Sequence, residues 1–343
     1  MRAALTALLS LVATSALAQQ PLDVPAKQLP VPNTVSPQVQ KLIGAPLRNN
    51  WNIQPKTGEE WKVVADQGAE PTIKNLPKLL DDLKVKVEKQ TIDGVRVFVV
   101  TPEKILPQNK NRVLIHMHGG CYVLNPREAG LPEAVMIAAF GGFKVMAVDY
   151  RMPPEAYFPA ALDDGITVWK ALLKQKVKPK NIGILGTSAG GALTLAMVLK
   201  AKELKLPMPG AISSGTPMSD VTKAGDTFQT NEMVDNVLVS RDGFCDAGTK
   251  VYANGRDFKD PLLSPVYGDM GGFPPTILTS GTRDLLLSNT VRVHRKLRQA
   301  GVIADLNVYE GQSHAHYLRD HTAPETKEVF TDMGKFFDRH LGK

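Results

Sequence analysis

Short apolar runs recur at intervals from residue 85 to the end of the chain, which is the pattern of strands buried in a sheet. The first two runs, 85–91 and 95–100, alternate apolar and polar positions on either side of Asp93-Gly94, a dipeptide typical of a tight hairpin turn. The other runs are apolar at nearly every position, so they predict strands with both faces covered. They lie at 113–117, 145–148, 182–185, 211–213, 276–278 and 306–308.

Segments with a helical period separate most of these strands. They lie near 128–140, 160–175, 189–203, 288–300 and 325–340, and Asn289 is in position to cap the start of the fourth. Strands that alternate with helices form βαβ units. The pattern therefore predicts an α/β fold whose sheet has eight strands, is mostly parallel and carries helices on both faces.

Two segments do not follow this alternation. Prolines interrupt residues 19–50 repeatedly and predict an extended arm. Leucines at helical spacing predict a helix that Asn75 caps at its start and that ends near 84. A long stretch at 217–255 fits neither period and predicts an inserted lid. This stretch is polar, which favours soluble, smaller substrates. Its polar residues include Asp220, Lys223, Asp226, Asn231, Glu232 and Asp235. The core domain is then expected at 85–216 and 256–343.

Residues 1–18 have the layout of a secretory signal peptide. Arg2 supplies positive charge, an almost wholly apolar run follows, and Ala16-Leu17-Ala18 has the small-x-small form of a cleavage site. The alternative is a membrane anchor, but the run is shorter than the roughly 20 apolar residues that span a bilayer. We expect cleavage after Ala18, no membrane anchor in the mature chain, and a periplasmic or secreted protein.

Composition excludes several classes of protein. The 343 residues are 43% hydrophobic and 22% charged, as in an ordinary globular protein, so a mainly disordered chain is excluded. The net charge of +7 is spread along the chain without a basic stripe, and we expect no nucleic-acid partner. The 2 cysteines, Cys121 and Cys245, are too few for a disulfide scaffold or a four-cysteine zinc site.

The strongest chemical motif is Gly186-Thr187-Ser188-Ala189-Gly190. It follows an apolar strand and opens a helix, which is the context in which G-x-S-x-G exposes a nucleophilic serine on a sharp turn. A glycine-rich connection without chemistry is the alternative. We predict Ser188 as the nucleophile.

A second motif, His116-Met117-His118-Gly119-Gly120-Cys121, ends another strand. Paired glycines let backbone N–H groups approach a ligand closely, and such donors stabilise a developing oxyanion. We predict that Gly119 and Gly120, with Ala189, form an oxyanion hole. A plain turn and a metal site at the two histidines are the alternatives; no third ligand lies near, so we expect no metal.

A serine nucleophile needs a base and an acid that orients the base. On this kind of fold the expected order is serine, acid, histidine, and Asp284 and His314 each follow a predicted strand in that order. The rivals are Asp260 for the acid, and His316 and His321 for the base.

Four blocks together resemble the hormone-sensitive-lipase-like branch of the α/β-hydrolases, known in bacteria as family IV, in its G-T-S-A-G form. They are His118-Gly119-Gly120, the stretch 149–161, Gly186 to Gly190, and Asp284 with 310–314. The resemblance covers roughly 85–343. It implies an α/β-hydrolase with a helical cap made from 19–84 and 217–255, a Ser188-Asp284-His314 triad, and a structural role for the 149–155 block.

The resemblance also implies an activity. We expect a serine carboxylesterase that hydrolyses small-molecule esters with short- to medium-chain acyl groups through an acyl-enzyme, with no cofactor, as a monomer or homodimer. The alternatives are a catalytically silent binding module, an amidase or peptidase, and a lipase. Cys121 stands where the family usually has a third glycine. It could pair with Cys245 in an oxidising compartment, although two separate buried thiols are the simpler expectation.

Overall fold

The sheet has eight strands in the order β1-β2-β4-β3-β5-β6-β7-β8. β2 pairs antiparallel with β1 and β4, and every other pair is parallel. All eight predicted strands are present, and the α/β-hydrolase fold class is confirmed. Their bounds are Val85–Ile92, Val95–Pro102, Val113–Met117, Lys144–Val148, Ile182–Thr187, Ala211–Gly215, Thr276–Gly281 and Ala304–Tyr309 for β1 to β8.

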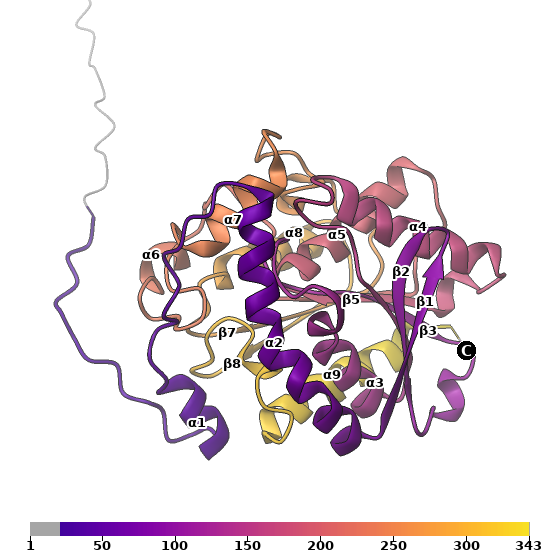
Figure 1. Ribbon diagram of the computed structural model, residues 1–343, viewed down its shortest axis with the longest axis horizontal. Coiled ribbons are helices and arrows are strands. Elements are labelled where there is room, and N and C mark those ends of the chain that lie inside the picture. Colours follow the sequence, from indigo (N-terminus) through magenta and orange to yellow (C-terminus); the bar gives the residue numbers. More distant parts are fainter. Residues whose placement is uncertain (1–20, 343) are drawn as a thin grey trace, which may run out of the picture. The chain divides into compact units, whose positions relative to one another are not determined.

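Five helices cover the two faces of this sheet (Figure 1). Helices α3 (Pro132–Gly141) and α9 (Pro324–His340) contact each other and share one apolar cluster with one face of the strands. Helices α4 (Ala160–Lys174), α5 (Ala189–Glu203) and α8 (Leu287–Gln299) share a second cluster with the other face. The core therefore consists of two layers, one on each side of a sheet whose middle strands are wholly buried.

The computed structural model describes residues 21–342. The predicted leader, 1–18, lies outside the described residues. Residues 21–30 contain no helix or strand, and the chain from Val31 onward forms one compact unit. Within the described residues, no helix is both long and apolar enough to cross a bilayer.

The N-terminal segment holds a short helix, α1 (Pro37–Ile43), and a long one, α2 (Gly58–Leu83). Thr57 caps α2 in a capping box with Glu60, so the helix starts well before Asn75, and the prediction of a cap at Asn75 is wrong. The first half of α2 buries Trp61 and small residues such as Ala65 and Ala69. That stripe escaped the sequence pattern because its members are mostly small.

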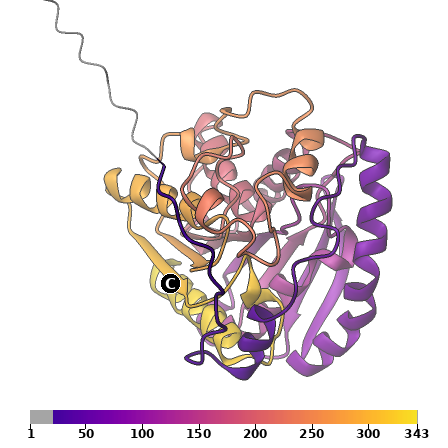
Figure 2. The same ribbon diagram turned by 90° about the vertical axis from the view of Figure 1, so that its left-hand side faces the viewer.

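The inserted segment is mostly irregular and contains two helices, α6 (Thr227–Thr230) and α7 (Phe244–Ala253), drawn in orange in Figure 2. Two of the acids that made this lid look polar, Asp220 and Asp235, are fully buried. Because these two acids do not contribute to the lid surface, they do not support the expectation of soluble, smaller substrates. The cap predicted at Asn289 is also wrong, because α8 begins after Leu286 and Asn289 is buried inside it.

Cys121 and Cys245 form a disulfide with an S–S distance of 2.00 Å. The expectation of two separate thiols is therefore wrong. Cys121 directly follows Gly120, and Cys245 lies in α7, so the bond joins the loop after β3 to the inserted lid. The two residues are 124 positions apart.

Candidate active site

Ser188 stands on the turn between β5 and α5. Its φ of 63° and ψ of −121° place it in a backbone conformation that is uncommon for a residue with a side chain. A Cβ at Gly190 would lie 1.9 Å from the carbonyl oxygen of Met117, and one at Gly186 would lie 2.3 Å from the same oxygen. Only glycine fits at either position, which explains why the motif can make so tight a turn.

Ser188 and His314 line one large cavity of about 1120 Å³, together with Gly119 and Gly120. Because β5 and β8 run parallel in the sheet, the loops that leave their carboxyl ends meet at the same edge. The structure thus brings the predicted nucleophile, the predicted base and the predicted oxyanion loop to one place.

Asp284 lies behind His314 and is fully buried. Its Oδ1 is 3.1 Å from Nδ1 of His314, so an N–H at that nitrogen donates to the carboxylate. Hydroxyl groups of Thr216 and Ser280 donate to Oδ2. Burial by itself would raise the pKa of Asp284, but the charge and hydrogen bond of His314 and the bond from Thr216 outweigh burial and lower it. The carboxylate is therefore ionised at neutral pH and can hold the imidazole in one orientation.

The rival residues have other partners. Asp260 pairs with Arg256, and its Oδ1 accepts the backbone N–H of Leu262. His316 Nε2 contacts Asn236 Oδ1 at 2.9 Å, and His321 pairs with Asp82. Of the residues considered from the sequence, only Asp284 and His314 contact each other beside the serine cavity.

The two glycines of the oxyanion loop lie where a side chain would not fit. A Cβ at Gly119 would be 2.8 Å from the carbonyl oxygen of Thr187 and 3.3 Å from Cβ of Ser188. Gly120 has a φ of 119°, and a Cβ there would be 2.6 Å from the carbonyl oxygen of Leu124. Ala189 is the first residue of α5. The loop therefore places backbone, and not side chains, against the turn that carries Ser188.

Buried side chains hold this loop in place. The Tyr150 hydroxyl donates to the carbonyl oxygen of His118 at 2.8 Å, and the two rings stack with centroids 4.0 Å apart. His118 in turn bonds the carbonyl oxygen of Gly119 through Nδ1 at 2.8 Å. Burial lowers the pKa of His118 to about 4, so the ring is neutral at neutral pH. Asp149 accepts the backbone N–H of Arg127, in keeping with the structural role that the resemblance implies for 149–155.

The other histidine of the motif has a different partner. His116 Nε2 lies 3.0 Å from one carboxylate oxygen of Glu133, and the Thr187 hydroxyl donates to the other at 2.6 Å. Thr187 also contacts the hydroxyl of Tyr317 at 2.9 Å. This buried chain of polar groups supports the residue that precedes Ser188, so both histidines serve the loops around the serine.

Asp235 is the residue that the sequence reasoning missed. It is fully buried, and each of its carboxylate oxygens accepts two backbone N–H groups. Oδ2 accepts from Leu285 at 2.8 Å and from His314 at 3.1 Å, and Oδ1 accepts from Val237 and Leu238. One carboxylate of the lid therefore connects the loop that follows β7, which carries Asp284, with the loop that follows β8, which carries His314.

Replacing Asp235 by asparagine should lower kcat roughly tenfold to a hundredfold, because misplacing a reacting group by about 1 Å costs that much. An asparagine side chain has one accepting oxygen, so its amide would face two of the N–H donors that the carboxylate now satisfies. Steady-state kinetics on a short-chain ester should show the loss in kcat with KM little changed, since Asp235 contacts His314 and not the substrate.

The matched control is Asp226→Asn, an exposed aspartate of the same lid segment. It should retain wild-type kcat. A fall in kcat that simply follows a fall in the fraction of folded protein, measured by thermal unfolding, would refute the positioning role of Asp235.

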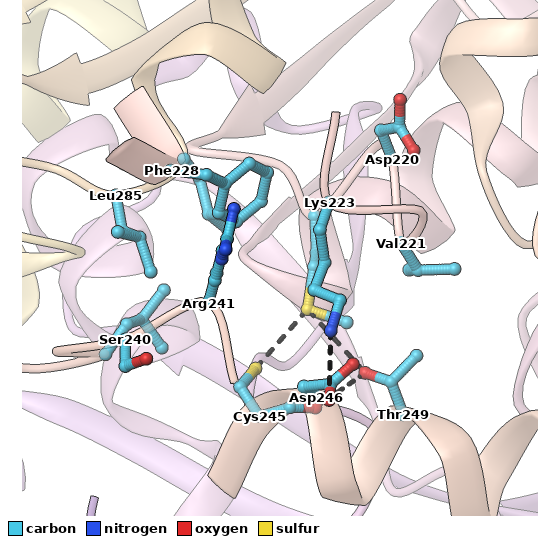
Figure 3. Close-up of a pocket in the computed structure, with 13 residues that line it drawn as sticks. Asp220, Val221, Lys223, Phe228, Ser240, Arg241, Cys245, Asp246, Thr249 and Leu285 are labelled. Atoms are coloured by element: carbon cyan, nitrogen blue, oxygen red, sulfur yellow. Dashed lines mark hydrogen bonds and ion pairs between the residues drawn. The ribbon is translucent and has the colours of Figure 1, made fainter. Parts of the chain in front are cut away.

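The lid also contacts the serine turn directly. The backbone N–H of Met218 donates to the carbonyl oxygen of Ser188 at 3.0 Å. Cys245 lies on α7 beside a small cavity (Figure 3). The volume of this cavity is about 40 Å³. The Sγ atom of Cys245 is 3.4 Å from Sδ of Met218. The disulfide, Met218 and the turn that carries Ser188 are therefore in continuous contact.

Comparison with known proteins places this geometry in a family. The model of a family described as alpha/beta hydrolase fold matches residues 114–318. An esterase of Acinetobacter venetianus is 31% identical over 248 residues, which are 71% of this chain and 81% of the relative. An acetyl-hydrolase of Streptomyces hygroscopicus is 27% identical over 252 residues, 73% of this chain and 84% of the relative.

Solved structures agree. The crystal structure of an esterase called E25 is 44% identical and superposes with a TM-score of 0.90, covering 94% of this chain and 99% of that one. An esterase from the bacterial hormone-sensitive lipase family is 26% identical with a TM-score of 0.76, covering 90% of this chain and 99% of that one. The chain therefore belongs to the alpha/beta hydrolase fold family, in its bacterial hormone-sensitive-lipase-like branch of esterases.

Proposed function

We propose that this protein is a serine carboxylesterase that hydrolyses short- to medium-chain esters through an acyl-enzyme. The observation that carries the proposal is the cavity that Ser188 and His314 share, with Asp284 bonded to the far side of the imidazole. The names of the relatives, esterase and acetyl-hydrolase, support the same reaction.

In the first half-reaction, His314 accepts the proton of the Ser188 hydroxyl while the oxygen attacks the ester carbonyl. The carbonyl oxygen becomes an oxyanion and receives N–H bonds from Gly119, Gly120 and Ala189. Asp284 keeps the ring in the tautomer that leaves Nε2 free, and its charge stabilises the imidazolium. His314 then gives its proton to the leaving alcohol, and the acyl group stays on Ser188.

In the second half-reaction, water takes the place of the alcohol. His314 removes a proton from the water, the hydroxide attacks the acyl carbonyl, and the same N–H groups receive the oxyanion. Collapse of this intermediate returns the proton to Ser188 and releases the acid. The residues of this chain supply every proton transfer in the cycle.

A series of 4-nitrophenyl esters from acetate through butyrate and octanoate to palmitate tests the proposal. We expect kcat/KM to reach its highest value at acetate or butyrate and not to rise further towards palmitate, because methylenes beyond the pocket gain nothing on binding. The acetyl-hydrolase relative supports a short acyl group. Butyryl anilide, which has a poorer leaving group on the same acyl chain, should react far more slowly.

Each alternative predicts a different outcome of the same series. A rate that rises to palmitate would indicate a lipase, and comparable rates on ester and anilide would indicate an amidase. If no substrate is hydrolysed and a fluorophosphonate probe does not label Ser188, the protein is a binding module and the proposal is overturned.

We also propose that the mature enzyme works outside the cytoplasm, in the periplasm or secreted. The charged-apolar-small pattern of residues 1–18 supports export. The Cys121–Cys245 disulfide supports it independently, because such bonds persist in oxidising compartments and are rare in the cytosol.

A further inference from the structure

The charges that line the serine cavity are unbalanced. Of the described residues that line it, three carry a permanent positive charge, Arg48, Lys78 and Arg319, and one is a carboxylate, Glu133. Both oxygens of Glu133 are occupied by bonds to His116 and Thr187. No free carboxylate of the described cavity wall therefore faces these cations.

Lys78 forms an ion pair, whereas neither arginine forms one within residues 21–342. Lys78 pairs with Asp82 on the exposed side of α2. Arg48 donates through Nε to the amide oxygen of Asn50 at 2.7 Å and lies 4.0 Å above the ring of Phe244, both neutral partners. Within residues 21–342, the guanidinium of Arg319 makes no hydrogen bond or ion pair, and it is exposed to the cavity.

The two guanidinium groups also act on each other. Burial, and then the positive charge of Arg319, lower the pKa of Arg48 to about 10, so both groups stay charged at neutral pH. Partial desolvation by the surrounding protein lowers the pKa of Arg319 as well, while the negative charge of the buried Asp235 opposes the shift. Two like charges held near each other are stabilised by any anion that binds between them.

The backbone of each arginine is connected to the loop that carries His314, by hydrogen bonds through Asn236 for Arg48 and by the chain itself for Arg319. The backbone N–H of Arg48 donates to the carbonyl oxygen of Asn236, and the backbone N–H of Asn236 donates to the hydroxyl of Ser313. Arg319 follows the short helix His316–Leu318, and its backbone N–H donates to the carbonyl oxygen of His316. An anion held by these residues would therefore lie on the same side of the cavity as the catalytic base.

We infer that the natural substrate is an ester that carries a carboxylate, which Arg48 and Arg319 bind. The inference rests on the proposed esterase function and names its substrate class. Guanidinium groups present N–H donors in a planar fork that matches a carboxylate, and bonds between two charged groups are stronger than neutral ones. The ester carbonyl lies at Ser188 while the charged end of the substrate lies at the two arginines.

The test compares esters of equal length. Monoethyl glutarate carries the carboxylate on the acyl part, 3-butyryloxypropanoate carries it on the alcohol part, and ethyl pentanoate is neutral. The wild type should show a higher kcat/KM on at least one of the anionic esters than on the neutral one. Arg48→Gln and Arg319→Gln should each reduce this ratio about tenfold, and the double variant about a hundredfold, as expected for loss of charged hydrogen bonds.

Arg339→Gln is the matched control. Arg339 is an exposed arginine of α9 that pairs with Asp305 and does not line the cavity, so its loss should leave the ratio unchanged. Arg48→Lys and Arg319→Lys keep the charge but not the fork, and should fall between the wild type and the glutamine variants. Thermal unfolding of each variant checks that it is folded.

Calorimetric binding of glutarate separates the two proposals, because it needs no turnover. Binding that is lost in the Arg48→Gln/Arg319→Gln variant supports the anion site, even if no ester in the series is hydrolysed and the esterase proposal fails. Hydrolysis of ethyl pentanoate with an anion-to-neutral ratio equal in wild type and variants, or no binding of glutarate to the wild type, would overturn the anion site and leave the esterase proposal standing.

Discussion

Replacing Ser188 by alanine should reduce ester hydrolysis at least about a thousandfold, with the loss in kcat. In the proposed mechanism this hydroxyl forms the acyl-enzyme, and an alanine side chain has no oxygen to replace it. The N–H groups proposed as the oxyanion hole, those of Gly119, Gly120 and Ala189, would remain and would keep the rate above that of the uncatalysed reaction. The measurement is kcat/KM on 4-nitrophenyl butyrate with purified protein.

Stability should barely change in this variant. The backbone conformation of Ser188, with its positive φ, is set by the close contacts of Gly186 and Gly190, and alanine adds no atom to it. Ser288→Ala, on α8 and away from the cavity, is the matched serine control and should keep wild-type activity. Residual activity of Ser188→Ala above about a thousandth of wild type would refute the assignment of the nucleophile.

The residues of the proposed triad could be identified from the sequence because each carries a local signal. Ser188 lies in a glycine-rich turn between an apolar strand and a helix, and Asp284 and His314 each follow an apolar strand. In a parallel sheet, the carboxyl ends of strands share one edge, so three local signals imply one site. Predicting that these residues share one site therefore requires only the three local patterns and the parallel arrangement of the strands.

Asp235 could not be predicted in this way. It lies in an irregular segment with no period, and its partner His314 is 79 positions further along the chain. In sequence it counts as a polar lid residue, yet the fold buries it completely against four backbone N–H groups. A buried carboxylate that bonds only to backbone leaves no side-chain partner for a sequence pattern to detect.

The same limit applies to the start of α2 and to the disulfide. The helix begins at a capping box around Thr57 and buries alanines that carry little hydropathy signal. Cys121 and Cys245 are separated by 124 positions, and only the docking of the lid on the oxyanion loop brings them together. Contacts of this kind follow from the packing of distant segments, which local propensity does not determine.

Removing the disulfide should lower the free energy of unfolding by about 4 kcal/mol. Closing a loop of 124 residues restricts the unfolded chain, and loops of that length are stabilised by roughly 5 kcal/mol in the chain-entropy model, of which part is usually offset in the folded state. The variant is Cys121→Ser/Cys245→Ser, because a single substitution would leave a reactive thiol. Its unfolding midpoint should fall by roughly 6 °C, measured by calorimetry at neutral pH.

A reductant provides the internal control, because it should reproduce the shift in the wild type and leave the unfolding midpoint of the double variant unchanged.

The same bond also fixes the residue after Gly120 to α7, so the double variant should lose kcat at temperatures where it is still folded. Intact mass of the exported wild type without reductant should match a chain that begins at Gln19 and holds a disulfide. Two free thiols in that mass, or equal unfolding midpoints in wild type and double variant, would show that this bond does not stabilise the enzyme. Because the lid reaches Ser188 through Met218 and the oxyanion loop through Cys121, we expect stability and turnover to decline together when the bond is lost.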